Sequence, residues 1–201
     1  MTIASSEQIA ERYRRVRDEV GERVTVVVAS KYVSAEEMAG LAEAGVEVVG
    51  ENRAQDLELK HAAYGDTFRW HFIGHLQSNK VKVVNRFCEL VHSLSSESAA
   101  TRLTVPALLE VNLAEEGTKS GVSPAEIASF LLRFPSICGL MTMPPLAADP
   151  EASRPYFRRL AEVAAEHELP ELSMGTSQDY RVAVEEGATL VRIGEALFKA
   201  H

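Results

Sequence analysis

The 201-residue sequence has little cysteine, an excess of acidic residues and no long hydrophobic run, and each of these features excludes a class of protein. Its two cysteines, Cys88 and Cys138, have no CxxC spacing, so neither a disulfide framework nor a zinc knuckle is indicated. The formal net charge of −8 argues against nonspecific binding to nucleic acids or acidic membranes, since both need a basic surface. No apolar run approaches the roughly 20 residues of a membrane span.

The sequence also lacks an apolar leader and the glycine-rich motifs of nucleotide sites. Its first 20 residues are typical of an amphipathic helix, so we expect no secretion and a cytoplasmic location. There is no GxGxxG after the first predicted strand and no GxxxxGK[ST], which weakens nucleotide-binding open sheets. Because 46% of the residues are hydrophobic, residues 1–201 can bury one sizeable core, and we predict a single domain.

Eight apolar segments of strand length alternate with segments of helical periodicity, behind one N-terminal helix. The predicted strands cover residues 24–30, 46–52, 69–74, 89–94, 106–113, 137–144, 171–174 and 189–194. Segments such as "VTVVVAS" and "TLVRI" are almost continuously apolar, which is typical of parallel strands buried on both faces. The pattern predicts an α/β fold: a single (β/α)8 TIM-type barrel with an extra N-terminal helix, or alternatively an open doubly wound sheet.

The helical segments carry ordinary start and stop signals. Ser34 and Glu37 have the spacing of a capping box, and Gly45 follows as a stop. Residues 96–103 give barely two helical turns. We therefore expect the outer ring of helices to be thin after the fourth strand.

In a barrel, function sits where strands end, and two such ends stand out. Lys31 ends the first strand; its amine is either solvated or, at the mouth of an apolar strand, partly desolvated and ready to form a Schiff base. The segment "SMGTS" (residues 173–177) can bind phosphate through hydroxyls and backbone N–H groups, or it is a helix cap with Ser177 at the N-cap. An amine facing a phosphate site fits an aldehyde-bearing phosphate ester such as pyridoxal 5′-phosphate.

Arg192 interrupts the last apolar strand, and a buried guanidinium is costly unless it meets a partner. The partner is either a ligand or a carboxylate, with Glu51 and Glu110 as candidates for an ion pair. If the ligand is pyridoxal phosphate, Arg192 is suited to face the pyridine nitrogen. An arginine there keeps that nitrogen unprotonated, so such a site binds the cofactor but stabilises carbanions poorly.

For three further segments, an ordinary structural role is an alternative to a role in the site. His71 and His75 have no third ligand at zinc-like spacing, so we expect no metal, and His71 can equally be a hydrogen-bonded core residue. The methionines of "GLMTMPP" either pack against a flat ring or fill the barrel. Lys119, in the mixed-charge loop "EEGTKSG", is expected to be solvated.

At these residues the chain resembles the pyridoxal phosphate homeostasis proteins, single-domain relatives of the alanine racemase barrel (fold type III among pyridoxal phosphate proteins). The matching blocks, in chain order, are "VVASK", "VVGENRAQ", "WHFIGHLQSNK", "VNLAEEGTKSG", "GLMTMPP", "LSMGTSQD" and "GATLVRIGEALF". Each block is modest alone, but together they run from the first strand to the last and are specific. The chain departs from the family in shorter outer connections and in Thr176, which stands where the family usually has methionine.

The resemblance implies a pyridoxal phosphate site made of Lys31, Asn52, Ser173, Met174, Gly175, Thr176, Ser177, Arg192 and Gly194. Lys31 would form the internal aldimine, Asn52 would lie near the ring, and Arg192 would face the pyridine nitrogen. The segment 173–177 and Gly194 would hold the phosphate. No metal and no catalytic residue are implied.

Three functions remain open at this point. The first is a pyridoxal phosphate-binding protein of vitamin B6 homeostasis without efficient amino-acid turnover; it would act as a monomer and could supply apo-enzymes. The second is a pyridoxal phosphate-dependent racemase or decarboxylase; racemisation needs two acid/base groups, and we expect no second domain to supply one. The third is a class I aldolase-like barrel, for which Glu51 is a weak candidate carboxylate.

Overall fold

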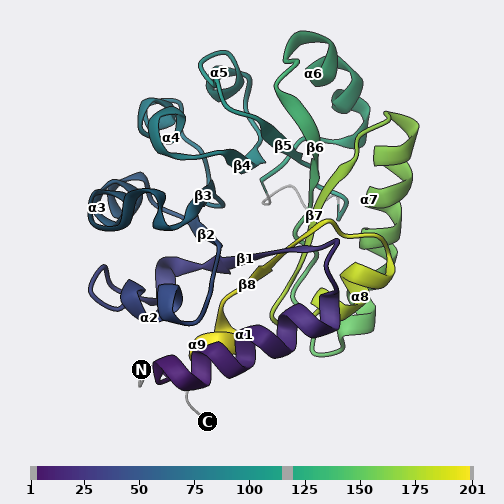
Figure 1. Cartoon of the computed structure of the whole chain (residues 1–201). Coiled ribbons are helices and arrows are strands. Elements are labelled where there is room, and N and C mark those ends of the chain that lie inside the picture. The colour runs from purple at the N-terminus through teal and green to yellow at the C-terminus, as the bar shows by residue number, and fades with distance from the viewer. Residues whose placement is uncertain (1–3, 115–119, 200–201) are drawn as a thin grey trace.

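Eight parallel strands pair in chain order, and the last pairs back onto the first, so the sheet closes into a barrel (Figure 1). The computed structural model describes residues 4–114 and 120–199. The strands are β1 (Thr25–Ala29), β2 (Val48–Glu51), β3 (Arg69–Phe72), β4 (Leu90–Leu94), β5 (Ala107–Glu110), β6 (Ile137–Met141), β7 (Glu171–Thr176) and β8 (Leu190–Ile193). Each overlaps a predicted strand, which confirms the (β/α)8 barrel and excludes the open sheet.

Helices follow the strands around the outside of the barrel (Figure 1). The α-helices are α1 (Ser6–Val20), α2 (Met38–Glu43), α3 (Ala54–Tyr64), α4 (Val81–Phe87), α5 (Glu97–Ala100), α6 (Ile127–Arg133), α7 (Arg154–Glu166), α8 (Tyr180–Glu185) and α9 (Glu195–Phe198). The short 3-10 helices are η1 (Ser30–Tyr32), η2 (Gly65–Thr67), η3 (Pro124–Glu126) and η4 (Pro150–Ser153). Helix α5 is a single turn, so the ring is thin where the sequence predicted it. No helix in the described ranges is long and apolar enough to cross a membrane.

Local signals explain the helix ends. Ser34 and Glu37 form the predicted capping box, in which the Glu37 carboxylate accepts the Ser34 N–H at 2.7 Å. Gly45 takes the left-handed conformation that ends α2, with φ of +75°. Helix α2 begins after this box, at Met38, because the residues between form a turn.

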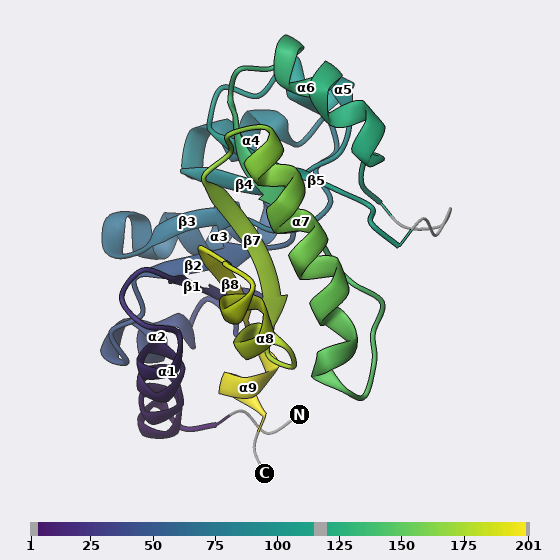
Figure 2. The same ribbon diagram turned by 90° about the vertical axis from the view of Figure 1, so that its right-hand side faces the viewer.

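The N-terminal helix α1 covers the seam at which the barrel closes. Helix α9 has only four residues, too few to cover β8, and α1 packs against α2, α8 and α9 in its place (Figures 1 and 2). The guanidinium of Arg12 donates to the carbonyl oxygens of Leu197 at 3.0 Å and Lys199 at 2.7 Å. The buried side of α1 is formed by Ile9, Tyr13, Val16 and Val20. This helix therefore replaces the missing outer helix after β8.

The strand side chains alternate between two cores. Val26 and Val28 point into the layer between strands and helices, whereas Val27 points into the barrel. The inward apolar layer consists of Val27, Val48, Leu108, Met141 and Leu190. Beyond it, toward the carboxyl ends of the strands, the barrel interior becomes polar: Arg192 lies two residues past the inward Leu190. The apolar layer is therefore the support on which a polar site is built.

Replacing Ile9 with alanine should destabilise the protein, because the side chain is 4% exposed and fixes α1 over the seam. The expected loss is about 2–5 kcal/mol of unfolding free energy, measured by urea denaturation. Leu132→Ala is the control, since Leu132 is 88% exposed and should change stability by less than about 0.5 kcal/mol. Equal stability of the wild type and Ile9→Ala would show that α1 is not needed to close the barrel.

Candidate functional site

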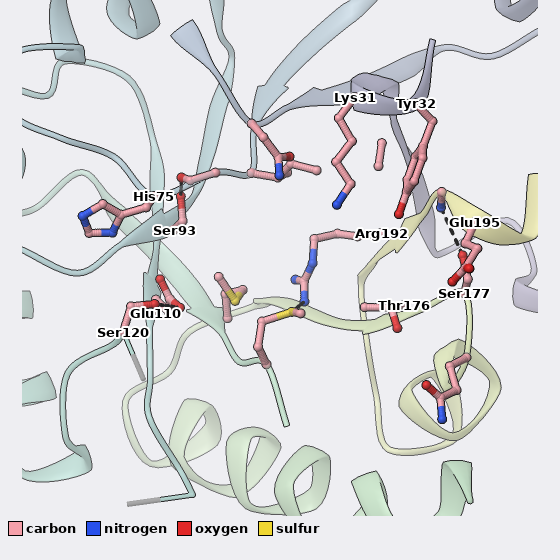
Figure 3. Close-up of a pocket in the computed structure, with 18 of the residues that line it drawn as sticks. Lys31, Tyr32, His75, Ser93, Glu110, Ser120, Thr176, Ser177, Arg192 and Glu195 are labelled. Atoms are coloured by element: carbon pink, nitrogen blue, oxygen red, sulfur yellow. Dashed lines mark hydrogen bonds between the residues drawn. The ribbon is translucent and has the colours of Figure 1, made fainter. Parts of the chain in front are cut away.

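A cavity of about 420 Å³ opens at the carboxyl ends of the barrel strands (Figure 3). Six of the nine predicted site residues line it: Lys31, Asn52, Thr176, Ser177, Arg192 and Gly194. They come from the segments that follow β1 and β2, and from the ends of β7 and β8 with their following loops. Four separate parts of the chain therefore meet in one cavity, as the barrel architecture requires.

Lys31 lies in the turn η1 directly after β1, and its side chain points into the cavity (Figure 3). Its amine lies 5.0 Å from the centroid of the Tyr32 ring. Of the two alternatives for Lys31, the structure agrees with the solvated amine and not with the partly desolvated one, because Lys31 is exposed. An exposed amine without a carboxylate partner among the described residues is accessible to a ligand.

A buried network fixes the strand ends that carry Lys31 and Asn52. Glu51 is 0% exposed and pairs with the amine of Lys60, which also donates to the Ser30 carbonyl oxygen at 2.8 Å. The Ser30 hydroxyl donates to the Glu51 carboxylate at 2.7 Å, and the same carboxylate accepts the Asn52 N–H at 3.0 Å. Removing either charged partner would leave the other buried and unpaired. The network therefore holds the ends of β1 and β2 in register.

Glu51 consequently has a structural role. Its side chain is enclosed by this network and does not line the cavity. The class I aldolase interpretation used Glu51 as the carboxylate beside the lysine, and the structure removes that support. It also removes Glu51 as an ion-pair partner of Arg192.

Asn52 lines the cavity and carries a buried acceptor. Its Oδ1 atom is buried and has no hydrogen-bond partner within the described ranges. Leaving such an acceptor unpaired costs roughly 1–3 kcal/mol, so a ligand hydroxyl or N–H would bind favourably there. The backbone after β3 approaches Asn52 closely, and only a glycine at position 74 allows this. A Cβ atom on Gly74 would lie 2.1 Å from the Asn52 carbonyl oxygen.

Ser177 brings the loops after β7 and β8 together. Its Oγ atom accepts the backbone N–H groups of Gly194 and Ala196, both at 3.1 Å. Helix α8 begins at Tyr180 with Asp179 as its N-cap, so the alternative in which Ser177 caps that helix is wrong. One hydroxyl and two N–H groups converge at the place where barrels commonly bind phosphate.

Three predicted residues lie outside the cavity lining. Ser173 and Met174 are both 0% exposed, and Met174 packs in the outer core. Gly175 has φ of +90°, and an added Cβ would lie 2.6 Å from the Cβ of Ala183. The pairing of β7 with β8 shifts register between Ser173 and Thr176. The predicted direct contacts of Ser173, Met174 and Gly175 with a ligand therefore lack support; these residues shape the strand that presents Thr176.

Thr176 has a partner of its own. The carboxylate of Asp179 accepts its N–H at 2.7 Å and its hydroxyl at 3.0 Å. The second oxygen of that carboxylate accepts the Ser153 hydroxyl at 2.7 Å. A phosphate contact of Thr176, as the resemblance implies for the segment 173–177, would have to compete with Asp179.

The guanidinium of Arg192 is held by neutral oxygens. It donates to the carbonyl oxygens of Ser173 at 3.0 Å and Thr142 at 3.1 Å, and it also donates to the Ser173 hydroxyl. The Met143 sulfur lies 2.9 Å from Nη2. No carboxylate lies within ion-pair distance of Arg192 in the part of the chain that the structure describes, so the ion-pair alternative with Glu51 or Glu110 is wrong.

Burial lowers the pKa of Arg192 to about 10, although the charges of Asp179 and Glu110 raise it. The guanidinium therefore keeps its proton at neutral pH. A buried permanent cation at the edge of a ligand cavity is suited to donate a hydrogen bond to a neutral or anionic acceptor.

His71 is the hydrogen-bonded core histidine that the sequence allowed. Its Nδ1 atom lies 2.9 Å from Nε2 of His92, and Nδ1 of His92 lies 2.7 Å from the Ser173 hydroxyl. Burial, followed by the charge of Arg69, lowers the pKa of His71 to about 3. Burial, followed by the charges of His71 and Arg192, holds the pKa of His92 well below the ordinary value. Both rings are neutral at physiological pH.

Sequence reasoning missed several lining residues. Tyr32, Glu110 and Glu195 line the cavity and were not assigned to it (Figure 3). Glu110 carried a usable signal, since it is a charged residue in an apolar strand, as Arg192 is. Met141 and Met143 line the cavity, and Met141 also belongs to the apolar layer that fills the barrel, so both alternatives for the methionines stay open. Lys119 lies outside the described residues.

Comparison with known proteins assigns the family. The description "Alanine racemase, N-terminal domain" matches residues 4–201. A pyridoxal phosphate homeostasis protein of Aquifex aeolicus is 43% identical over 191 residues, which cover 85% of this chain and 84% of the relative. The chain belongs to the pyridoxal phosphate homeostasis protein family. A second family member, from Vibrio alginolyticus, is 36% identical and covers 89% of this chain and 87% of its own length.

Solved structures support the same family. PipY of Synechococcus elongatus PCC7942, solved with PLP bound, superposes with a TM-score of 0.87 at 31% identity and covers 95% of this chain and 100% of PipY. Alanine racemase from Corynebacterium glutamicum has a TM-score of 0.74 at 16% identity and covers 98% of this chain and 62% of the racemase. The racemase shows a shared fold alone, whereas PipY lies within the range of a family relative.

The two buried histidines should make the fold sensitive to mild acid. Their folded-state pKa values lie below the unfolded value near 6.5, so the unfolded chain binds protons first as the pH falls. Their contribution is complete above about pH 6.5 and is lost as the pH falls toward the folded values, at roughly 1.4 kcal/mol per pH unit for each ring. Urea unfolding at several pH values between 7 and 5 measures how the free energy of unfolding changes with pH. This change should be smaller for His71→Phe than for the wild type. Identical changes with pH would mean that folding does not lower the pKa of His71.

Proposed function

We propose that this protein binds pyridoxal 5′-phosphate through Lys31 and serves in the homeostasis of that cofactor, without efficient turnover of amino acids. One observation carries the proposal: an exposed lysine amine with no carboxylate partner in the described ranges shares a cavity with Ser177 and Gly194, whose polar groups converge there. An amine and an anion site in one cavity match the two ends of an aldehyde-bearing phosphate ester.

Each remaining part of the cavity fits one part of the cofactor. The aldehyde of pyridoxal phosphate supplies an electrophilic carbon to which an amine adds. The Ser177 hydroxyl would donate to the phosphate, and the N–H groups of Gly194 and Ala196 would exchange the Ser177 oxygen for a phosphate oxygen. The unpaired Oδ1 atom of Asn52 would accept a hydrogen bond. Arg192 would donate to the pyridine nitrogen, as the buried guanidinium is the cation that lines the inner part of the cavity.

The same arginine supports binding over turnover. At a pKa of about 10 the guanidinium holds its proton at neutral pH, so it donates a hydrogen bond without protonating the ring nitrogen. An unprotonated pyridine withdraws electrons weakly, which disfavours racemase and decarboxylase chemistry. The relatives named above carry a homeostasis name, in agreement with this preference. A monomeric state, a cytoplasmic location and delivery of the cofactor to apo-enzymes stay predictions.

Lys31→Ala should abolish the covalent link to the cofactor, because no other lysine of the described ranges lines the cavity. The purified wild type, incubated with pyridoxal phosphate, should show a visible absorbance band that borohydride removes, and peptide mass mapping should place the reduced adduct on Lys31. Lys82→Ala, which changes an exposed lysine on α4, is the matched control and should retain both results. An adduct of equal yield in Lys31→Ala would reject the assignment.

Arg192→Ala should weaken cofactor retention by roughly tenfold or more, which corresponds to the loss of a hydrogen bond to a charged group. Equilibrium dialysis against pyridoxal phosphate measures the loss, and circular dichroism shows whether the variant is folded. Arg23→Ala, at an exposed arginine, is the control. A folded Arg192→Ala with unchanged affinity would give Arg192 a purely structural role.

A further inference from the structure

A continuous hydrogen-bonded chain of side chains runs beneath the cavity. It begins at His71 on β3, passes through His92 on β4 and Ser173 on β7, and ends at Arg192 on β8. The four residues are 2%, 0%, 0% and 7% exposed, so no part of the chain is solvated along its length. Only Arg192, at its end, also lines the cavity.

The donors and acceptors of this chain admit one arrangement of protons. A guanidinium can only donate, so the Ser173 oxygen accepts from Arg192. Among the described residues the hydroxyl hydrogen of Ser173 has no acceptor other than Nδ1 of His92, so it points there. Since His92 is neutral, its proton is on Nε2, and it donates to Nδ1 of His71. His71 then carries its proton on Nε2. Every proton position therefore follows from the charge on Arg192.

Packing alone does not account for this chain. The layer directly below is made of valine, leucine and methionine side chains, which fill the barrel without polar atoms. Buried imidazoles and hydroxyls cost free energy unless every polar atom finds a partner. The interior changes from apolar to polar at the level of Arg192, and the polar residues lead to its guanidinium rather than to the solvent.

We propose that His71, His92 and Ser173 are positioning residues, which fix the Arg192 guanidinium for the ligand because each residue of the chain turns its acceptor toward the Arg192 end. Ser173 holds Nη1 with its carbonyl and hydroxyl oxygens, while the Thr142 carbonyl holds Nη2. The orientation is thus set before a ligand arrives, which reduces the ordering cost of binding. This inference rests on the proposed function, because it assigns these residues to the pyridoxal phosphate site.

An isosteric pair of variants at His92 separates positioning from packing. Asparagine has an amide oxygen where His92 has Nδ1, so His92→Asn keeps an acceptor for the Ser173 hydroxyl. Leucine has nearly the same shape as asparagine but no polar atom, so His92→Leu removes the acceptor. Pyridoxal phosphate is titrated against each variant and the wild type. We expect the Kd to rise roughly tenfold in His92→Leu and less than about threefold in His92→Asn. His61→Leu, outside the barrel between Trp70 and Phe87, should leave the Kd unchanged.

The outcomes are distinct. Equal losses in the two folded His92 variants, or no loss in either, would overturn the positioning role while leaving the proposed function intact. A wild type that binds no pyridoxal phosphate would overturn the proposed function, and the role of the chain in that site with it.

A measurement on the wild type keeps the inference testable if His92→Leu does not fold. Long-range proton–nitrogen NMR spectra of the histidine rings, recorded at pH 7 without any ligand, report which nitrogen carries the proton. We expect neutral rings with the proton on Nε2 for both His71 and His92. A proton on Nδ1 of either ring would break the deduced direction of the chain and overturn the proposal.

Discussion

Closure of the barrel between β8 and β1 is the constraint on which the site depends. Parallel pairing places Arg192 beside Val27 and directs the carboxyl ends of all eight strands to one rim. Lys31 follows the first strand and Gly194 follows the last, so the two strands at the seam supply adjoining parts of one cavity. Helix α1 supports this arrangement from outside, because the single turn of α9 leaves the seam otherwise uncovered.

Two buried polar networks adapt this barrel to a ligand. The first, around Glu51 and Lys60, lies outside the cavity lining and holds the ends of β1 and β2. The second runs from His71 to Arg192 beneath the cavity. Each places costly polar groups in the interior and satisfies them with hydrogen bonds, so their partners are restricted to a few geometries. The rigidity of the site follows from that restriction.

The two cations of the cavity differ in a way that suits different tasks. Lys31 is exposed and has no carboxylate partner in the described part of the chain, so its amine is accessible to an electrophile. Arg192 is buried, fixed by carbonyl and hydroxyl oxygens, and charged at neutral pH. One group can react and the other can only hold a ligand, which agrees with a protein that retains a cofactor.

The sequence by itself determined the eight strands, their order and the polar residues at their ends, because apolar runs and strand-end lysines or arginines are local patterns. Tertiary structure alone decided the rest. Ser173 and Met174 belong to the same short block as Ser177, yet a register shift in the pairing of β7 with β8 leaves both outside the cavity lining. His92 meets Ser173 only because the barrel closes. Strand register and long-range hydrogen bonds depend on residues that are far apart in the sequence, so local sequence patterns do not determine them.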